Sequence, residues 1–437
     1  MVNTKSVTGK TTIEGRVRAL ARGGDSAIET PLGIVFARGA LPGEVVVLDR
    51  VRRTRGTLQG RVVEVLHSSE ERVNPPCEIA DTCGGCPFMH ASARSQREAK
   101  TAMLTEAVLA SERSTSNAPE VEWIESGPKL GYRRRARLHF SGARLGYRPR
   151  GDRALVDVKL CLVLVETLRE AVSEFRTRVS SHVQGEGTLR LGMGTSGLAV
   201  IWMDAQDPQP PALYSQLESW VEEGGLAGAS LRAGGASVAA RFGDTWEWIP
   251  RDTQVPMIGT EGGFSQANDP VNQALIGHVT ELADCQDVRV LELHAGSGNL
   301  TLALATLARH VVAVESHPEA CRALRQNIES LPRGRVRVIE GDALHEVKGP
   351  PVEVVVLDPP RAGAKHLIAS IVKRRPSRIV YVSCDTASLK RDLFRFAGLG
   401  YRVDRALAFD MFPQTAHLES VVRLIPLDPL ATPSAER

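Results

Sequence analysis

The sequence of 437 residues lacks any run of about 18 consecutive apolar residues, so we expect no membrane-spanning helix. Its first residues, MVNTKSVTGKTTIEGR, lack the apolar segment that a secretory signal needs. The hydrophobic content of 42% and charged content of 24% are ordinary for a globular protein. We therefore expect a cytoplasmic, monomeric protein of two to four domains that has no membrane partner.

A large net charge is also missing, because the chain as a whole carries only +3. The charge is unevenly spread, however. Residues 1–65 have 11 Lys and Arg against 6 Asp and Glu, and residues 128–153 have 9 against 1. Two basic surfaces suggest a polyanionic partner such as a nucleic acid. The alternative is charge that only keeps the protein in solution.

Two regular patterns divide the chain. Short β-like runs recur about every ten residues over 8–66, which is typical of a small closed barrel of the OB type. After residue 260, runs of Val, Ile and Leu alternate with helical stretches, which indicates a doubly wound α/β domain. A mixed, β-rich region lies between them. We expect domains at 1–67, 68–260 and 261–437, and a helix over 91–112 that can pack on the last domain.

A nucleotide pocket is predicted where the run LELHAGSGNLTLALA turns from strand to helix. Gly296 and Gly298 would let the backbone approach a ligand closely. Glu315 ends the next strand, where an acid reaches a ribose hydroxyl, and Asp342 ends the third strand, near an adenine amine. A ribose and an adenine without a pyrophosphate describe S-adenosylmethionine (SAM). The alternative is a plain turn with surface acids.

A lone cysteine, Cys384, stands in YVSCDTASLKRD, where an apolar run gives way to a helix-like run. Cys384 and the run LDPPRAGA at 357–364 are each predicted to lie at the carboxyl end of a strand. Both strand ends are beside the predicted pocket. A helix start near Lys390 and Arg391 would lower its pKa and make the thiol reactive. A cysteine at a strand end is otherwise a packing residue.

Three motifs in order carry a family resemblance: D-P-P-R-x-G, then Y-x-S-C, then D-M-F-P-Q-T-x-H-L-E at 410–419. The chain resembles the RNA uracil-C5 methyltransferases over nearly its whole length. It is most similar to the 23S rRNA branch, in which a TRAM domain and an iron–sulfur cluster precede the catalytic domain. The resemblance implies a TRAM barrel, a central iron–sulfur domain and a SAM-dependent methyltransferase domain.

The chemistry of that reaction explains the residue types. A thiolate that adds to uracil C6 makes C5 nucleophilic enough to take a methyl group, and a base must then remove the C5 proton. The resemblance implies that Cys384 is the nucleophile and Glu419 the base. Asp358 would position the ribose or the uracil, and Arg361 a phosphate or a nearby acid. Without the motif order, Glu419 would be a strand-edge charge and Asp358 a turn acid.

The same resemblance implies further cofactor contacts, from Gln266 in FSQAN and from Asn299. His294 stands where the SAM turn usually has an aromatic residue, and Glu292 where that strand usually has Asp. The family also usually has Asn and then Pro after the nucleophile. Here Asp385 and Thr386 take these places, and Asp385 puts a charge where an amide is usual.

Four of the seven cysteines suggest a metal site. Cys77, Cys83 and Cys86 are close in sequence, and Cys161 follows much later. Four thiolates can hold zinc or a [4Fe–4S] cluster. A single C-x2-C pair with a distant cysteine, together with the family resemblance, favours the cluster. The C-x3-C-x2-C spacing of radical SAM enzymes is absent, and we interpret the remaining Cys285 and Cys321 as structural.

An arginine-rich run, YRRRARLHF at 132–140, is predicted to contact RNA. Because alternate residues of a strand face opposite sides, Arg133, Arg135 and Arg137 would share one face and Arg134 the other. Such a face can follow phosphates, and the target base must be exposed in a loop or flipped out. The alternative is a solvated, arginine-rich strand.

We therefore expect a SAM-dependent RNA uracil-C5 methyltransferase that acts on 23S rRNA. Methylation of tRNA uracil is the first alternative, although relatives with that role often lack the barrel and the cluster. The second alternative is an iron–sulfur RNA-binding protein without catalysis, which the replacements Asp385 and Thr386 motivate.

Overall fold

The computed structural model describes residues 6–7, 10–111, 118–149, 154–194, 197–251, 257–261 and 263–427. They form two compact units. One comprises Met1–Met103, Pro149–Ala154 and Phe412–His417, and the other comprises the rest, as far as they are described. Within the described ranges, no helix combines the length and apolar character needed to cross a bilayer.

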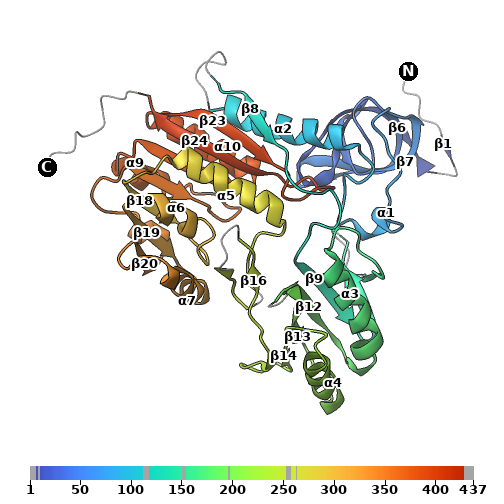
Figure 1. Ribbon diagram of the computed structural model, residues 1–437. Coiled ribbons are helices and arrows are strands. Elements are labelled where there is room, and N and C mark those ends of the chain that lie inside the picture. The colour runs from blue at the N-terminus through green and yellow to red at the C-terminus, as the bar shows by residue number, and fades with distance from the viewer. Residues whose placement is uncertain are drawn as a thin grey trace. The chain divides into compact units, whose positions relative to one another are not determined.

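A closed five-stranded barrel dominates the first unit (Figure 1). Inward residues such as Ile28, Val35 and Val46 are fully buried and alternate with more exposed ones, as expected for barrel strands. The predicted OB-like barrel is therefore confirmed. The elements of this part of the chain are β1 (Ser6–Val7), β2 (Lys10–Thr11), β3 (Ile13–Leu20), β4 (Ser26–Thr30), β5 (Gly33–Ala37), β6 (Val45–Thr54), β7 (Thr57–His67) and α1 (Ala80–Cys83).

A seven-stranded sheet forms one part of the second unit, in the order β11-β10-β9-β12-β13-β14-β15. One face packs on two helices through residues such as Leu138, Leu189 and Trp220. The opposite face carries Arg137 and Arg190, which lie directly opposite each other on paired strands. The elements are β9 (Ala136–Ser141), β10 (Arg144–Tyr147), β11 (Val156–Asp157), α3 (Glu166–Glu174), β12 (Glu186–Met193), β13 (Ala199–Ala205), α4 (Pro211–Glu222), β14 (Gly228–Ala233) and β15 (Ala240–Gly243).

An eight-stranded sheet forms the other part of this unit, in the order β20-β19-β18-β21-β22-β24-β23-β8 (Figure 1). Its central strands are buried along nearly their whole length, which explains their continuous Val, Ile and Leu runs. The strands are β8 (Val121–Ile124), β18 (Arg289–Leu293), β19 (His310–Glu315), β20 (Val336–Glu340), β21 (Val354–Leu357), β22 (Arg378–Ser383), β23 (Tyr401–Phe409) and β24 (Glu419–Pro426).

Helices cover this sheet and complete the predicted doubly wound α/β domain, which is confirmed. Leu104 and Val108, from the second half of α2 (Ala93–Leu109), are buried in the core of the sheet. The three predicted domain boundaries stay a prediction. The helices are α5 (Asp269–Ala283), α6 (Thr301–Leu307), α7 (Pro318–Asn327), α8 (Ala343–Glu346), α9 (Ile368–Lys373) and α10 (Thr386–Gly398), and the short strands β16 (Trp248–Ile249) and β17 (Met257–Ile258) precede them.

The strand order gathers several chain segments at one edge of the sheet. β18, β21 and β22 are parallel, so their carboxyl ends meet there, on both sides of the point where the strand order reverses. β24 runs antiparallel to β22, so it begins where β22 ends. At the far edge, Arg378 at the start of β22 donates a hydrogen bond to Asp284 after α5 (2.8 Å). Helix α5 therefore begins toward the edge where β22 ends.

Candidate active site

The predicted nucleophile and base are neighbours at this edge. Ser383, the last residue of β22, pairs with Ser420, and the Ser420 hydroxyl donates to the Ser383 carbonyl (3.0 Å). Cys384 follows Ser383, and Glu419 precedes Ser420. In an antiparallel pair, these two residues are therefore adjacent. The Glu419 side chain is buried and the Cys384 thiol is half-buried.

The electrostatic environment of Cys384 is acidic. Burial, together with the charges of Glu419 and Asp358, raises the pKa of the thiol to about 11, while Arg361 acts in the opposite direction. The same three side chains influence one another. Burial and Asp358 raise the pKa of Glu419 well above its usual range, against Arg361. One thiol, two carboxyls and one guanidinium thus form a single electrostatic cluster.

The predicted lowering of the Cys384 pKa by Lys390 and Arg391 is wrong. The Lys390 ammonium pairs with Glu106 (2.8 Å). The Arg391 guanidinium bonds to Asp392 (2.8 Å) and to the Ala362 carbonyl. The cation that acts on the thiol is Arg361, and it does not offset burial and the acids.

Asp358 connects this electrostatic cluster to the predicted SAM turn, which follows β18. It directly follows β21, and its backbone N–H donates to the carbonyl of Leu293 at the end of β18 (3.3 Å). Burial raises the pKa of its carboxyl to about 7. A carboxyl in that range can hold or release a proton near neutral pH.

Asp385 has a structural task that explains part of the departure from the usual motif. Its carboxylate caps helix α10 by accepting the backbone N–H of Ser388 (2.7 Å). Asp and Asn are both strong N-cap residues, and Thr386 then occupies the first helical position, where Pro is also favoured. The helix that follows Cys384 therefore begins correctly with either pair of residues.

The predicted SAM turn lies between β18 and α6, and His294 in it has φ +63°, an uncommon backbone conformation for a side-chain-bearing residue. Burial lowers the pKa of the His294 imidazole, while Glu315 and Asp342 raise it, so the three side chains share one region. Glu315 accepts the backbone N–H of Gly296 (2.9 Å). A Cβ at Gly296 would meet no atom within 4 Å, so the turn borders open space.

Two amide side chains fasten this turn to α5. Asn299 and Asn272 exchange reciprocal hydrogen bonds of 3.0 and 2.9 Å. Gln266 is buried just before α5, between Ser265, which bonds to Glu247 (2.8 Å), and Ala267. The sequence did not predict a role for Asn272, because a single amide residue in a helix does not indicate its hydrogen-bond partner.

Glu292 is a further residue whose role the sequence left undefined. It lies in the middle of buried β18, only 2% exposed, and its Oε2 accepts no hydrogen bond from the described residues. Burial raises the pKa of its carboxyl to about 8, with Asp358 and Glu315 adding to the effect. The sequence feature that points to Glu292 is the presence of an acidic residue inside the apolar run VRVLELHAG.

The four predicted metal-ligating cysteines form no disulfide among the described residues, and all four are half-buried. Cys77, Cys83 and Cys86 belong to one compact unit and Cys161 to the other. The Tyr147 hydroxyl lies 3.8 Å from the Cys161 sulfur. No group of three or more His, Cys, Asp or Glu side chains is arranged to hold a metal ion among the residues that the structure describes. The donor types, four cysteine sulfurs, suit an iron–sulfur cluster.

The arginine run divides into structural and exposed members. Arg134 is buried and pairs with Asp269 (2.8 Å), and Arg135 pairs with buried Glu247 (3.3 Å). Arg133 donates to the Arg135 carbonyl (2.8 Å). Arg137 is exposed on the sheet face opposite the helices. The geometry thus favours Arg137 over Arg133 and Arg135 as an RNA contact.

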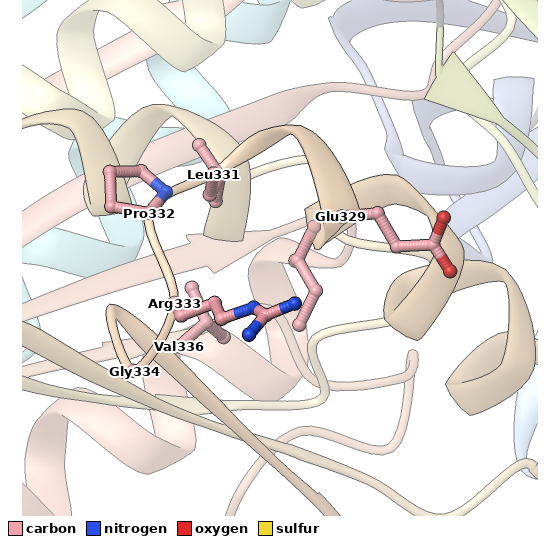
Figure 2. A pocket seen from close by; sticks show the side chains of 7 residues that line it. Glu329, Leu331, Pro332, Arg333, Gly334 and Val336 are labelled. Carbon is pink, nitrogen blue, oxygen red and sulfur yellow. The ribbon is translucent and has the colours of Figure 1, made fainter.

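A pocket lined by residues such as Leu331, Pro332 and Arg333 lies between α7 and β20 (Figure 2). None of the predicted catalytic or cofactor residues lines it. We assign no role to it.

Comparisons with known proteins agree with this geometry. A family model described as tRNA (Uracil-5-)-methyltransferase matches residues 251–426. The chain is 33% identical over 432 residues to the 23S rRNA (uracil(1939)-C(5))-methyltransferase RlmD of Chromohalobacter salexigens, covering 93% of this chain and 88% of that protein. The chain belongs to the RNA uracil-C5 methyltransferase family. The family resemblance found in the sequence is thereby confirmed.

Other members of the family extend the comparison. An uncharacterized RNA methyltransferase of Thermotoga maritima is 31% identical over 443 residues, covering 94% of this chain and 98% of that protein. The crystal structure of a Pyrococcus abyssi tRNA (uracil-54, C5)-methyltransferase with S-adenosyl-L-homocysteine has a TM-score of 0.74 and 22% identity, covering 94% of this chain and all of that one. This last similarity shows a shared fold.

Alkylation of the Cys384 thiol in the free protein is expected to be slow at pH 7. Because only the thiolate reacts and burial sets the pKa at about 11, the rate should rise about tenfold per pH unit up to pH 10. Mass spectrometry of the Cys384 peptide after timed iodoacetamide treatment measures this alkylation rate. Glu419→Gln removes a charge that raises this pKa, so it should speed alkylation at high pH. The control Glu340→Gln should leave the alkylation rate unchanged. Fast, pH-independent alkylation of the wild-type protein would contradict the expectation.

Proposed function

We propose that this protein methylates C5 of a uridine in 23S rRNA, with SAM as methyl donor and a covalent Cys384–uracil adduct as intermediate. The observation that carries the proposal is the pairing of Ser383 with Ser420, which makes Cys384 and Glu419 neighbours. The position of this pair beside Asp358 and the glycine turn supports methyl transfer there. The relative named for 23S rRNA supports the choice of RNA.

In the proposed reaction, the residues around Cys384 act in a fixed order. The Cys384 thiolate adds to C6 of the uracil, and the ring electrons move to O4 and C5 as an enolate. Gln266, His294, Asn299, Glu315, Asp342 and Asp358 would hold SAM at the turn. SAM would supply the electrophilic methyl group to C5 and would be left as S-adenosylhomocysteine. Glu419 then accepts the C5 proton, the C5–C6 double bond reforms, and Cys384 leaves as a thiolate.

The pKa directions agree with these roles. A Glu419 whose pKa lies well above the usual range is a strong base once it is ionised, and so it suits removal of a proton from carbon. A Cys384 thiol with a pKa of about 11 is largely protonated in the free protein. We infer that substrate binding activates it, with Arg361 and the carboxylate of Asp358, as acceptor of the thiol proton, favouring the thiolate, so that Glu419 remains available for the C5 proton.

The adduct provides a direct test. With an rRNA fragment that contains 5-fluorouridine at the target, methyl transfer leaves fluorine at C5, which a base cannot remove as a proton, so the adduct should persist in denaturing gels. Cys384→Ala should abolish the band, and Cys285→Ala, a buried cysteine elsewhere, should keep it. On natural RNA, Glu419→Gln should lower turnover at least about 10²-fold, the scale of a lost general base. No adduct with any cellular RNA would favour the alternative of a binding protein without catalysis.

The choice between rRNA and tRNA rests on relatives. The fold is shared with a protein named for tRNA, whereas the more similar sequence is named for 23S rRNA over most of both chains. Methyl transfer to purified 23S rRNA but not to tRNA is the expected result. Since rRNA is made in the cytoplasm, we propose a cytoplasmic location. The monomeric state stays a prediction.

We further propose that Cys77, Cys83, Cys86 and Cys161 hold a [4Fe–4S] cluster. Four half-buried cysteines support it, and three of them lie within ten residues around the single turn of α1. Thiolate ligands select iron–sulfur clusters or zinc. The cluster would be structural, and no step of the reaction depends on it.

Protein purified without oxygen should be brown and contain about four iron atoms per chain. Cys86→Ser should lower both iron content and thermal stability, whereas Cys321→Ser, a buried cysteine outside the set, should leave the iron content unchanged. Elemental analysis that finds zinc in place of iron would replace the cluster by a zinc site.

For RNA binding we propose the polar face of the seven-stranded sheet. Arg137 and Arg190 lie directly opposite each other, and Arg190 and Arg232 both approach Asp204, at 2.6 and 3.7 Å. Two arginines share this aspartate and a third lies opposite one of them, which leaves a positive surplus. Like charges opposite each other on a sheet repel, and a phosphate between them would relieve that repulsion.

The double variant Arg137→Gln with Arg232→Gln should weaken RNA binding at low salt. The slope of log Kd against log salt should fall by about one per lost phosphate contact. Arg322→Gln, an exposed arginine on α7, is the control and should leave the slope unchanged. Filter binding between 50 and 300 mM salt measures both, and equal slopes would remove this face from the proposal.

A further inference from the structure

A buried carboxylate on α10 lies outside the reacting cluster and touches the loop that carries part of it. Asp392 is fully buried. Its Oδ2 accepts the backbone N–H of Ala364 (2.6 Å) and the hydroxyl of Tyr381 (2.9 Å). Its Oδ1 accepts from the Arg391 guanidinium (2.9 Å). A buried charge so well supplied with donors is stable only while all these partners stay in place.

The partners come from three different segments. Tyr381 belongs to β22, Arg391 and Asp392 belong to α10, and Ala364 ends the loop that follows β21. Arg391 also donates to the Ala362 carbonyl (2.7 Å), so the loop is held through two backbone groups. Between them, Gly363 has φ +75°, and a Cβ there would lie 2.4 Å from the Asp392 carboxylate. The loop is therefore pressed directly against the helix.

This loop and this helix bear the reacting groups. Asp358 and Arg361 lie in the loop, only a few residues before Ala362, and both act electrostatically on Cys384. Cys384 lies just before the first turn of α10, one residue before the cap Asp385. The Asp392 network is thus a buried polar link between the two segments whose relative position affects the charge around the thiol.

We propose that Asp392, together with Tyr381 and Arg391, is a positioning network that keeps Asp358 and Arg361 in register with Cys384 during the reaction. It touches neither substrate nor cofactor, and it acts through the loop. The inference rests on the proposed function, since it assigns the network an effect on the attack of the thiol at C6. A misplacement of about 1 Å in such a constellation can lower a rate about 10²-fold.

Asp392→Asn is the sharpest test. One carboxylate oxygen is replaced by an NH2 group that would face N–H or O–H donors, so the loop should shift while the volume stays the same. We expect adduct formation with 5-fluorouridine RNA to slow by at least about tenfold at saturating RNA and SAM. The dissociation constant for S-adenosylhomocysteine, measured by calorimetry, should change less than about threefold. The pH dependence of Cys384 alkylation should also shift, because Arg361 and Asp358 would move relative to the thiol.

Tyr381→Phe guards against a loss of folding. It removes one of the donors and leaves the carboxylate and the Ala364 bond, so it should show the same effects to a smaller degree. Asp404→Asn is the matched control. Asp404 pairs with Arg423 (2.7 Å) between β23 and β24 and does not touch the loop. It should lower thermal stability without changing the adduct rate or the alkylation profile.

The outcomes are separable. If wild-type protein forms no adduct, the proposed function fails, and this inference fails with it. If the wild type is active and Asp392→Asn and Tyr381→Phe match Asp404→Asn in adduct rate and alkylation profile, only the positioning role is overturned. A slower adduct rate with an unchanged alkylation profile and weakened cofactor binding would also overturn it, because the damage would then lie on the cofactor side.

Discussion

The pairing of β22 with β24 is the constraint on which the candidate active site depends. A parallel strand in this position would begin at the opposite edge of the sheet and leave Cys384 without Glu419 as its neighbour. Because β24 runs antiparallel, its first residue, Glu419, stands next to the residue that ends β22. Two groups separated by 35 positions in the sequence thereby become neighbours through backbone hydrogen bonds alone.

Around this pair the protein concentrates buried acids. Glu292, Asp358 and Glu419 all have raised pKa values, and burial is the first cause for each. Together with the thiol, they form a site where protons are held more tightly than in water. Such an environment suits a reaction that must take a proton from carbon, and it explains why the free thiol is kept unreactive.

Much of the fold could be predicted from periodicity, because strands buried on both faces must be apolar throughout and barrel strands must alternate. The motif order also placed Cys384, Asp358 and Glu419 at strand ends. The sequence could not reveal electrostatic partners. The choice of Lys390 and Arg391 over Arg361 as the cations near the thiol failed because Lys390 pairs with Glu106 and Arg391 with Asp392. Likewise, nothing in YRRRARLHF distinguishes Arg135, which pairs with Glu247 more than one hundred residues away, from exposed Arg137.

The short strand β8 has a consequence for how the molecule can be divided. Val121–Ile124 lie beside Ala406–Phe409 and cap the outer strand of the methyltransferase sheet. Residues far upstream of the reacting motifs therefore supply the last hydrogen-bonded row of that sheet. A fragment cut at the start of the α/β pattern would leave β23 with a bare row of N–H and C=O groups, open to pairing with another copy. The methyltransferase sheet is complete only when both halves of the chain contribute to it.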